Sequence, residues 1–406
     1  MHLDLVRRCD GSFTYDGNEQ YGAGRTEDNS YGGKSSYNDL SPTASYVLTY
    51  ALPLKKLYIT GRDAASANSL QDKDITAAIA SGRFDLTRKG LNANQLIDAF
   101  KDWSPVVRSW AAEELAKRPE SRALVPQLIT MAEGHDAHQR QGAAEALGYI
   151  KDLTSLPVLS RLLTHEDRWL RVKAAHALKN MQDLAKPAVP AMLKAVVDTA
   201  ESISPVVWED PIQLTHGELA AALFNGLLND SIAGLDTKLL YPAIQAIVKN
   251  PDGMARATLS GIFENNLSEE DVKQLAPDIL EAIKIPCPAD TMFSGEIRMS
   301  AFLALTKYRY QEGIEAGVIF AQTQGGHGSE TRTGQIMAII ASYGSAAKGV
   351  IPELHKLIDI LDRQAKNNEF PSDLNQQRTS AVKKAIHSIE SATTHPEMKT
   401  IVTSSK

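Results

Sequence analysis

The chain has 406 residues, enough for two or three compact domains or for one extended array of repeats. Its 43 Lys and Arg against 49 Asp and Glu give a formal net charge of -6, which disfavours nucleic acid and anionic membranes as partners. Cys9 and Cys287 show no CxxC spacing, so neither a disulfide framework nor a structural zinc site is indicated.

The chain contains no run of 18 apolar residues, and the segment that follows Met1 has no apolar core typical of a secretory signal. We therefore expect a soluble protein that does not span a membrane. Its compartment is cytoplasmic by default, and periplasmic or extracellular if a preceding segment carries a signal.

Residues 1–62 differ in composition from the rest of the chain. They are rich in Gly, Tyr, Asn and Ser, contain CDGSF at 9–13, and carry one apolar helix predicted at about 41–53. The segment is either the edge of a larger fold or a loop that binds a glycan or a cation. The candidate residues for the second alternative are Asp10, Tyr15, Asp16 and Tyr21. Residues 63–91 are predicted to be a connecting helix and a linker.

A two-helix unit recurs between residues 92 and 391. Three segments carry it most clearly: VVRSWAAEELAKR (106–118), HQRQGAAEALGYI (138–150) and WLRVKAAHALKNM (169–181). Each has an Arg, an Ala-Ala pair and then a Leu, and each follows an apolar segment, often opened by proline. One such helix pair is too short to bury its apolar face alone, so stacked neighbours must close a continuous core.

Weaker copies continue to residue 391 and bring the predicted number of units to eight. Seven units keep the arginine, and the fourth has Glu218 in its place; the arginines are Arg108, Arg140, Arg171, Arg256, Arg298, Arg332 and Arg378. We interpret them as structural, because an Arg beside an inter-helix turn can satisfy carbonyls at a helix end or pair with an acid of the next repeat. A ladder that binds a polyanion is the alternative. The predicted fold is all-α, an α-solenoid of about eight helix pairs.

This pattern resembles HEAT repeats, and GAAEALGYI at 142–150 is similar to the bacterial HEAT-like repeats of phycobilin lyases. The resemblance covers about three quarters of the chain and implies an armadillo-like fold but no single function. Deoxyhypusine hydroxylase, a relative of this type, builds a di-iron centre from repeated His-Glu dipeptides, whereas this sequence has one, His165-Glu166. Alkyl-base DNA glycosylases of similar architecture use a basic face, which an acidic chain does not supply.

CDGSF, the glycine-rich loop and the apolar helix resemble the terminal repeat of the α/α toroid of terpenoid cyclases and prenyltransferases. LSPTASYVLTYALPLKKLYITG at 40–61 is similar to the end of such a toroid in a planctomycete-type bacterial family whose HEAT-like repeats follow it. The resemblance implies that residues 1–62 are a toroid remnant. The acidic cluster of the cyclases and the zinc ligands of the prenyltransferases have no convincing counterpart, so we predict no catalytic residue, cofactor or metal.

The repeat period breaks at TAESISPVVWEDPIQLTH (199–216), which we predict to be an exposed insertion with Trp208, Glu209, Asp210 and His216. An exposed Trp beside two acids favours a partner with a basic or amide-bearing surface. A tolerated surface insertion is the alternative.

A second break, TQGGHGSETRTG (323–334), places His327 before a helix start, where free N–H groups could receive an anion. It lacks the lysine of a nucleotide-binding loop, so an ordinary inter-helix turn is the simpler interpretation. Residues 392–406 show no packing pattern and are predicted to be a disordered tail.

Two functions follow from these patterns. The first is a non-catalytic interaction scaffold that binds a protein, or a glycan or other extended ligand, through the concave solenoid face and the 199–216 insertion. The alternative is the C-terminal part of a larger toroid-containing enzyme or polysaccharide-binding protein. An acidic cavity cluster encoded upstream of Met1 would favour the alternative.

Overall fold

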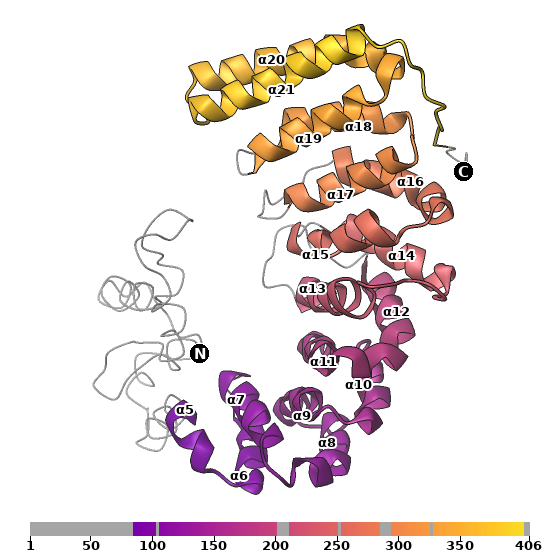
Figure 1. Ribbon diagram of the computed structural model, residues 1–406. Helices are drawn as coiled ribbons and strands as arrows, with labels where there is room; N and C mark the ends of the chain where they lie inside the picture. The colour runs from indigo at the N-terminus through magenta and orange to yellow at the C-terminus, as the bar shows by residue number, and fades with distance from the viewer. Residues whose placement is uncertain are drawn as a thin grey trace, which may run out of the picture. The chain divides into compact units, whose positions relative to one another are not determined.

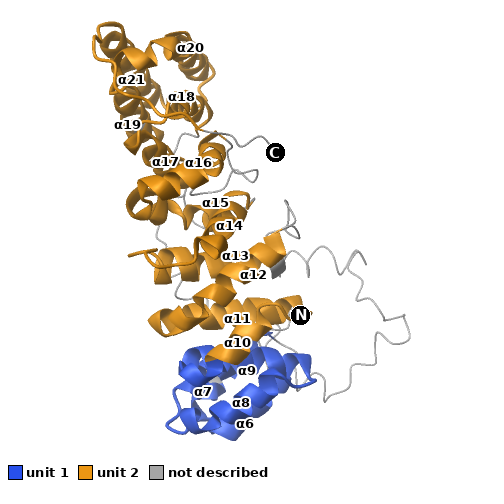
Figure 2. Ribbon diagram, turned by 90° about the vertical axis from the view of Figure 1, so that its right-hand side faces the viewer, with its two compact units in different colours: residues 1–155 blue, residues 156–406 orange. Residues whose placement is uncertain are grey.

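The computed structural model describes residues 84–102, 105–200, 211–250, 253–284, 294–324 and 328–401 (Figure 1). These residues are mostly helical, and an isolated bridge pairs Tyr310 with Lys399. The chain divides into two compact units, residues 1–155 and 156–406 (Figure 2). Each unit is built from helix pairs, as the sequence predicts.

The described part of the first unit holds two helix pairs, α6/α7 and α8/α9. Its elements are α5 (Phe84–Thr87), η5 (Arg88–Gly90), α6 (Ala93–Asp98), η6 (Ala99–Lys101), α7 (Pro105–Ala116), η7 (Ser121–Leu124), α8 (Val125–Ala132), α9 (Ala137–Ile150) and η8 (Leu153–Ser155). Helix α9 packs on both α7 and α8, and Phe100, Leu115 and Leu147 are fully buried between the helices. A Cβ at Gly142 would lie 2.7 Å from the Phe100 ring. Because glycine has no side chain, α9 can pack closely against Phe100 of η6.

The second unit continues with six pairs. Its elements are α10 (Leu156–Leu162), α11 (Arg168–Met181), η9 (Gln182–Ala188), α12 (Val189–Thr199), α13 (Pro211–Ala222), η11 (Leu223–Leu227), α14 (Thr237–Val248), α15 (Gly253–Ala257), η12 (Ile262–Asn266), α16 (Glu269–Lys284), α17 (Ser294–Lys307), α18 (Glu312–Thr323), α19 (Ser329–Ala341), η13 (Gly344–Val350), α20 (Ile351–Lys366) and α21 (Ser372–Glu390).

The six pairs of the second unit stack in two layers. The first helices of the pairs, α12, α14, α16, α18 and α20, contact one another in order, while among the second helices α11 packs on α13, α15 on α17, and α19 on α21 (Figure 1). We call the latter the second-helix layer. Phe263, Phe302 and Phe320 are buried between the layers. The predicted all-α fold of stacked helix pairs is confirmed in the described residues of each unit, two pairs in the first and six in the second.

Side-chain caps fix where several of the helices begin. The Asp136 carboxylate accepts from the Gln139 N–H at the start of α9, and Asp167 does the same for Trp169 and Leu170 at the start of α11. Asn92 and Gln95 exchange hydrogen bonds in a capping box that starts α6. Each cap satisfies backbone donors that have no partner inside the helix.

The recurring arginine closes the turn between the two helices of a repeat. In three successive repeats its guanidinium donates to a carbonyl six residues earlier, from Arg108 to Asp102, from Arg140 to Gly134 and from Arg171 to His165. These carbonyls follow the C-terminal end of the first helix, where the helix dipole also favours a cation. The structural interpretation of the arginines is thereby confirmed for these repeats.

Arginines of the later repeats reach across repeat boundaries. Arg298 donates to the carbonyl of Ile283 at 2.7 Å and to the Thr323 hydroxyl at 2.6 Å, at the ends of α16 and α18. Burial, together with the charges of Arg256 and Arg332, lowers the pKa of Arg298 to about 10. It therefore stays cationic at neutral pH. Because Arg108, Arg256, Arg298 and Arg378 are all buried, these four do not form an accessible ladder for a polyanion.

The prediction of disorder for residues 392–406 is wrong for the described part, 392–401. The carbonyl of Thr394 accepts from the Ser345 N–H at 2.9 Å, and Lys399 exchanges backbone hydrogen bonds with Arg309 and Gln311. The Lys399 ammonium also pairs with Glu269. We call residues 392–401 the C-terminal strap. It is ordered by backbone hydrogen bonds to successive inter-repeat turns, which need no apolar periodicity and so leave no pattern in the sequence.

Candidate functional site

Most of the residues proposed as sites from the sequence lie outside the described residues. They are Asp10, Tyr15, Asp16 and Tyr21 of the N-terminal segment, Trp208, Glu209 and Asp210 of the insertion, and His327. For these residues the sequence-based hypotheses stay predictions.

His216 was predicted to be exposed on the insertion, and the structure corrects this. Helix α13 begins at Pro211, so His216 belongs to the helix, where its side chain is fully buried. Proline is favoured at a first helical position because it has no N–H to leave unsatisfied. The insertion is therefore shorter at its C-terminal end than its sequence suggests, and His216 cannot contact a partner directly.

The hydrogen bonds of His216 define its tautomer. Its Nε2 lies 2.6 Å from the hydroxyl of Thr199, which itself donates to the carbonyl of Ala195 at 2.7 Å. The hydroxyl proton is thus already used, so Nε2 carries the proton and donates to Thr199. Nδ1 is buried with no partner among the described residues, and burial lowers the pKa of His216 to about 4. His216 is a neutral structural residue at pH 7.

Glu218, which replaces the arginine in the fourth repeat, contacts side chains of the preceding repeat. Its carboxylate accepts from the Lys179 ammonium at 2.9 Å and lies 3.6 Å from Nδ1 of His176, both on α11. Burial alone would raise the pKa of Glu218, but the hydrogen bonds from His176 and Lys179 outweigh it and hold the pKa at about 2. This carboxylate is therefore ionised and serves packing between α11 and α13.

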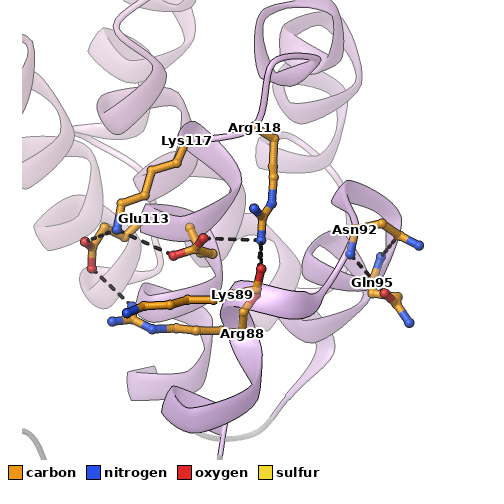
Figure 3. Close-up of polar contacts among 8 residues, drawn as sticks. Arg88, Lys89, Asn92, Gln95, Glu113, Lys117 and Arg118 are labelled. Atoms are coloured by element: carbon orange, nitrogen blue, oxygen red, sulfur yellow. Dashed lines mark hydrogen bonds and ion pairs between the residues drawn. The ribbon is translucent and has the colours of Figure 1, made fainter.

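A charged cluster in the first unit ties the segment before α6 to α7 (Figure 3). Glu113 pairs with Lys117 at 2.7 Å and with Arg88 at 3.3 Å, while Arg118 pairs with Glu114 and donates to the carbonyls of Arg88 and Lys89. Burial tends to raise the pKa of Glu113, yet the two cations lower it overall. Since the acids in this cluster are engaged by cations, we assign it a structural role.

A cavity of about 560 Å³ opens on the second-helix layer of the second unit. It lies between α17 and α19, which approach each other less closely than α19 and α21 do, and η12 closes one side. Met299, Leu303 and Ile339 supply its apolar surface; Ser260, Glu264, Glu296, Ser300, Arg332 and Gln335 supply its polar lining, with Ala338 completing it.

A second cavity of about 390 Å³ follows between α19 and α21. Met337, Ala341 and Ala381 line it, and Lys384 and Ser388 are its polar residues. Ala338 borders both cavities, so they adjoin. We call the two cavities together the second-helix groove. It crosses four successive repeats on the side formed by their second helices.

Sequence reasoning missed the second-helix groove. Its apolar residues occur in the segments EIRMSAFLAL (296–305) and TRTGQIMAIIA (331–341), for which the repeat pattern predicts helices and nothing more. Half-buried Met299, Leu303 and Ile339 stand beside the fully buried positions of the same helices. An apolar stripe wider than the core requires is the signal that could have pointed to this surface.

Within the described ranges, no three His, Cys, Asp or Glu side chains lie close enough together to hold a metal ion. No helix in this described part of the chain has the length and apolar character needed to cross a bilayer. The groove offers shape, apolar contact and charge, which are means of binding a partner.

Comparison with known proteins agrees with the repeat architecture. The family model described as HEAT repeats matches residues 93–179 and 136–204, and the model described as a domain of unknown function (DUF6288) matches residues 1–61. No protein of curated function matches the chain. The all-α helix pairs and the family match together show HEAT-like repeats, a class that generally serves as a scaffold for protein interactions.

Two solved structures are similar to the chain at a low level. One is an archaeal HEAT-like repeat protein from Thermococcus onnurineus NA1, with 16% identity, a TM-score of 0.35, and coverage of 73% of this chain and 98% of that one. The other is an engineered protein, with 16% identity, a TM-score of 0.34, and coverage of 81% and 98%.

Proposed function

We propose that this protein is a non-catalytic interaction scaffold that binds a partner polypeptide along the second-helix groove and near the 199–216 insertion. The observation that carries the proposal is the groove itself. Its two adjoining cavities join an apolar floor to a polar rim, the composition found at binding sites for other chains. Met299, which is half-buried in the larger cavity, suits this role, because an unbranched thioether can repack around different partners.

The region around the insertion supplies a second support. Trp169 is 47% exposed on α11 and Met254 is 54% exposed on α15, and both helices pack against α13, which follows the insertion. Each stands two residues before the arginine of its repeat, at the start of a second helix. Large apolar side chains exposed at equivalent positions on both sides of α13 favour a partner that contacts this part of the layer.

A second candidate is that the chain is the C-terminal part of a larger toroid-containing enzyme or polysaccharide-binding protein. The CDGSF turn and the separate family match to residues 1–61 support a distinct module at this end. In that case the solenoid would serve the module as a platform.

Selection of peptides tests the scaffold function. Short random peptides displayed on phage are enriched on the full chain, and the enriched sequences are measured as synthetic peptides by fluorescence anisotropy. We expect Ile339→Glu to weaken their binding at least about tenfold, because a carboxylate would enter the apolar floor. Ile358→Glu is the matched control, since Ile358 is also half-buried but lies on α20 in the other layer. Equal loss with both variants, or loss with neither, would refute the role of the groove.

A further inference from the structure

The charges of the second-helix groove differ from one end to the other. Glu264 and Glu296 are exposed on the rim of the larger cavity. Lys384 is exposed on the rim of the smaller one and is its one charged residue. Neither Glu264 nor Lys384 forms an ion pair with another described residue. The groove therefore has an acidic end and a basic end, separated by helix α19.

Arg332 is the one cation in the lining of the larger cavity. A Cβ at Gly295 would lie 2.8 Å from Cζ of Arg332, and one at Gly328 would lie 3.0 Å from its Nη1. The guanidinium is thus packed against two glycine backbones at the start of α17 and α19. One fixed cation against two carboxylates leaves the larger cavity with a net negative charge, which favours a positive group in the occupant.

Ser260 adds an unused polar group to the same cavity. Its hydroxyl oxygen is buried and has no hydrogen-bond partner among the described residues. Buried polar groups of native proteins are normally paired, so one that lines a cavity is suited to a group brought by a ligand. The main chain of an extended peptide offers both donors and acceptors for it.

The spacing of the two ends sets the spacing of the ligand's charges. Packed helices lie about 8–10 Å apart, and the cavities occupy consecutive gaps on either side of α19. An extended chain advances about 3.3 Å per residue, so about three residues span from one cavity to the next.

Resting on the proposed function, we infer that the second-helix groove binds an extended segment with a Lys or Arg at one position and an Asp or Glu about three residues away. The basic side chain meets Glu264 and Glu296, and the acidic side chain meets Lys384. Between them, an apolar side chain fills the larger cavity against Met299, Leu303 and Ile339. The acidic and basic ends of the groove also determine in which of its two orientations the segment lies along the groove.

Charge reversal tests the inference without depending on loss of binding alone. The phage-displayed random peptides are selected separately on the wild-type chain, on Glu264→Lys/Glu296→Lys and on Lys384→Glu, with circular dichroism to confirm that each variant folds. Wild type is expected to enrich peptides with a basic and an acidic residue about three positions apart. The double variant should enrich an acid where wild type selects a base, and Lys384→Glu should replace the acid with a base.

Glu315→Lys is the matched control, because Glu315 is exposed on α18 in the other layer; it should select the same peptides as wild type. Peptides that lose binding with Ile339→Glu but keep the same charges on all the variants would overturn the inference while leaving the scaffold function standing. Failure of any peptide to depend on Ile339 would overturn both.

Discussion

Acidification should destabilise the folded chain through His216. In the folded state its Nε2 proton is held by Thr199 and its Nδ1 is buried without a partner among the described residues. Adding a second proton would place a charge and an unsatisfied N–H in the interior, which is why burial lowers the pKa of His216 to about 4.

The sign and size of the effect follow from the two pKa values. An unfolded histidine has a pKa of about 6.5, so below that pH the unfolded chain binds a proton that the folded chain refuses. The contribution is complete above pH 6.5 and is lost as the pH falls toward 4. The difference between a pKa of 6.5 in the unfolded chain and about 4 in the folded chain corresponds to about 3 kcal/mol of unfolding free energy.

Urea unfolding of the wild type and of His216→Gln between pH 7 and pH 4 measures this contribution. Glutamine keeps an N–H that can donate to Thr199 but takes up no proton. The variant is therefore expected to lose less stability than wild type across this range, with the two curves approaching or crossing at the acidic end. His355→Gln, which alters an exposed histidine on α20, should run parallel to wild type. If His216→Gln also ran parallel to wild type, the buried neutral histidine would be the wrong explanation.

Four further outcomes are expected. Leu147→Ala should lower the unfolding free energy by about 2–4 kcal/mol, because Leu147 is fully buried, and should shift one cooperative transition rather than a fraction of the signal. Gly317→Ala should destabilise by about 1–3 kcal/mol, since a Cβ there would lie 2.6 Å from the Phe302 ring, whereas Gly217→Ala, with open space around it, should be neutral or stabilising. Deleting residues 392–406 should speed hydrogen exchange at the Ser345 amide, which donates to Thr394, and leave α8 unchanged. Trp208→Ala should weaken partner capture by about 2 kcal/mol with an unchanged melting temperature, and a large fall in that temperature would contradict a binding role.

The repeat architecture could be predicted because its cause is local. Each helix pair carries its own apolar stripe, and the arginine of the first three repeats binds a carbonyl six residues before it. Such interactions are encoded within one repeat, so the period of the sequence reports them directly.

The second-helix groove and the position of His216 depend on tertiary packing. The larger cavity lies where α17 and α19 approach each other less closely than α19 and α21 do, and the spacing between neighbouring helices does not change the period of the sequence. His216 stands two residues before Glu218, where α11 exposes Trp169, yet it is buried because Thr199 of α12 lies against it. Equivalent positions in a repeat can therefore have opposite environments.

The C-terminal strap changes how this array must fold. In a stack of helix pairs almost every contact joins residues close in sequence, a property that favours fast folding repeat by repeat as the chain is synthesised. The pair between Lys399 and Glu269 instead joins residues 130 positions apart. The turns at Glu269, Arg309 and Ser345 leave the ribosome before the strap that binds them has been made. The last repeats are thus expected to assemble in two stages. Neighbouring helix pairs stack rapidly first, and the C-terminal strap docks on their turns more slowly, once residues 392–401 have been synthesised.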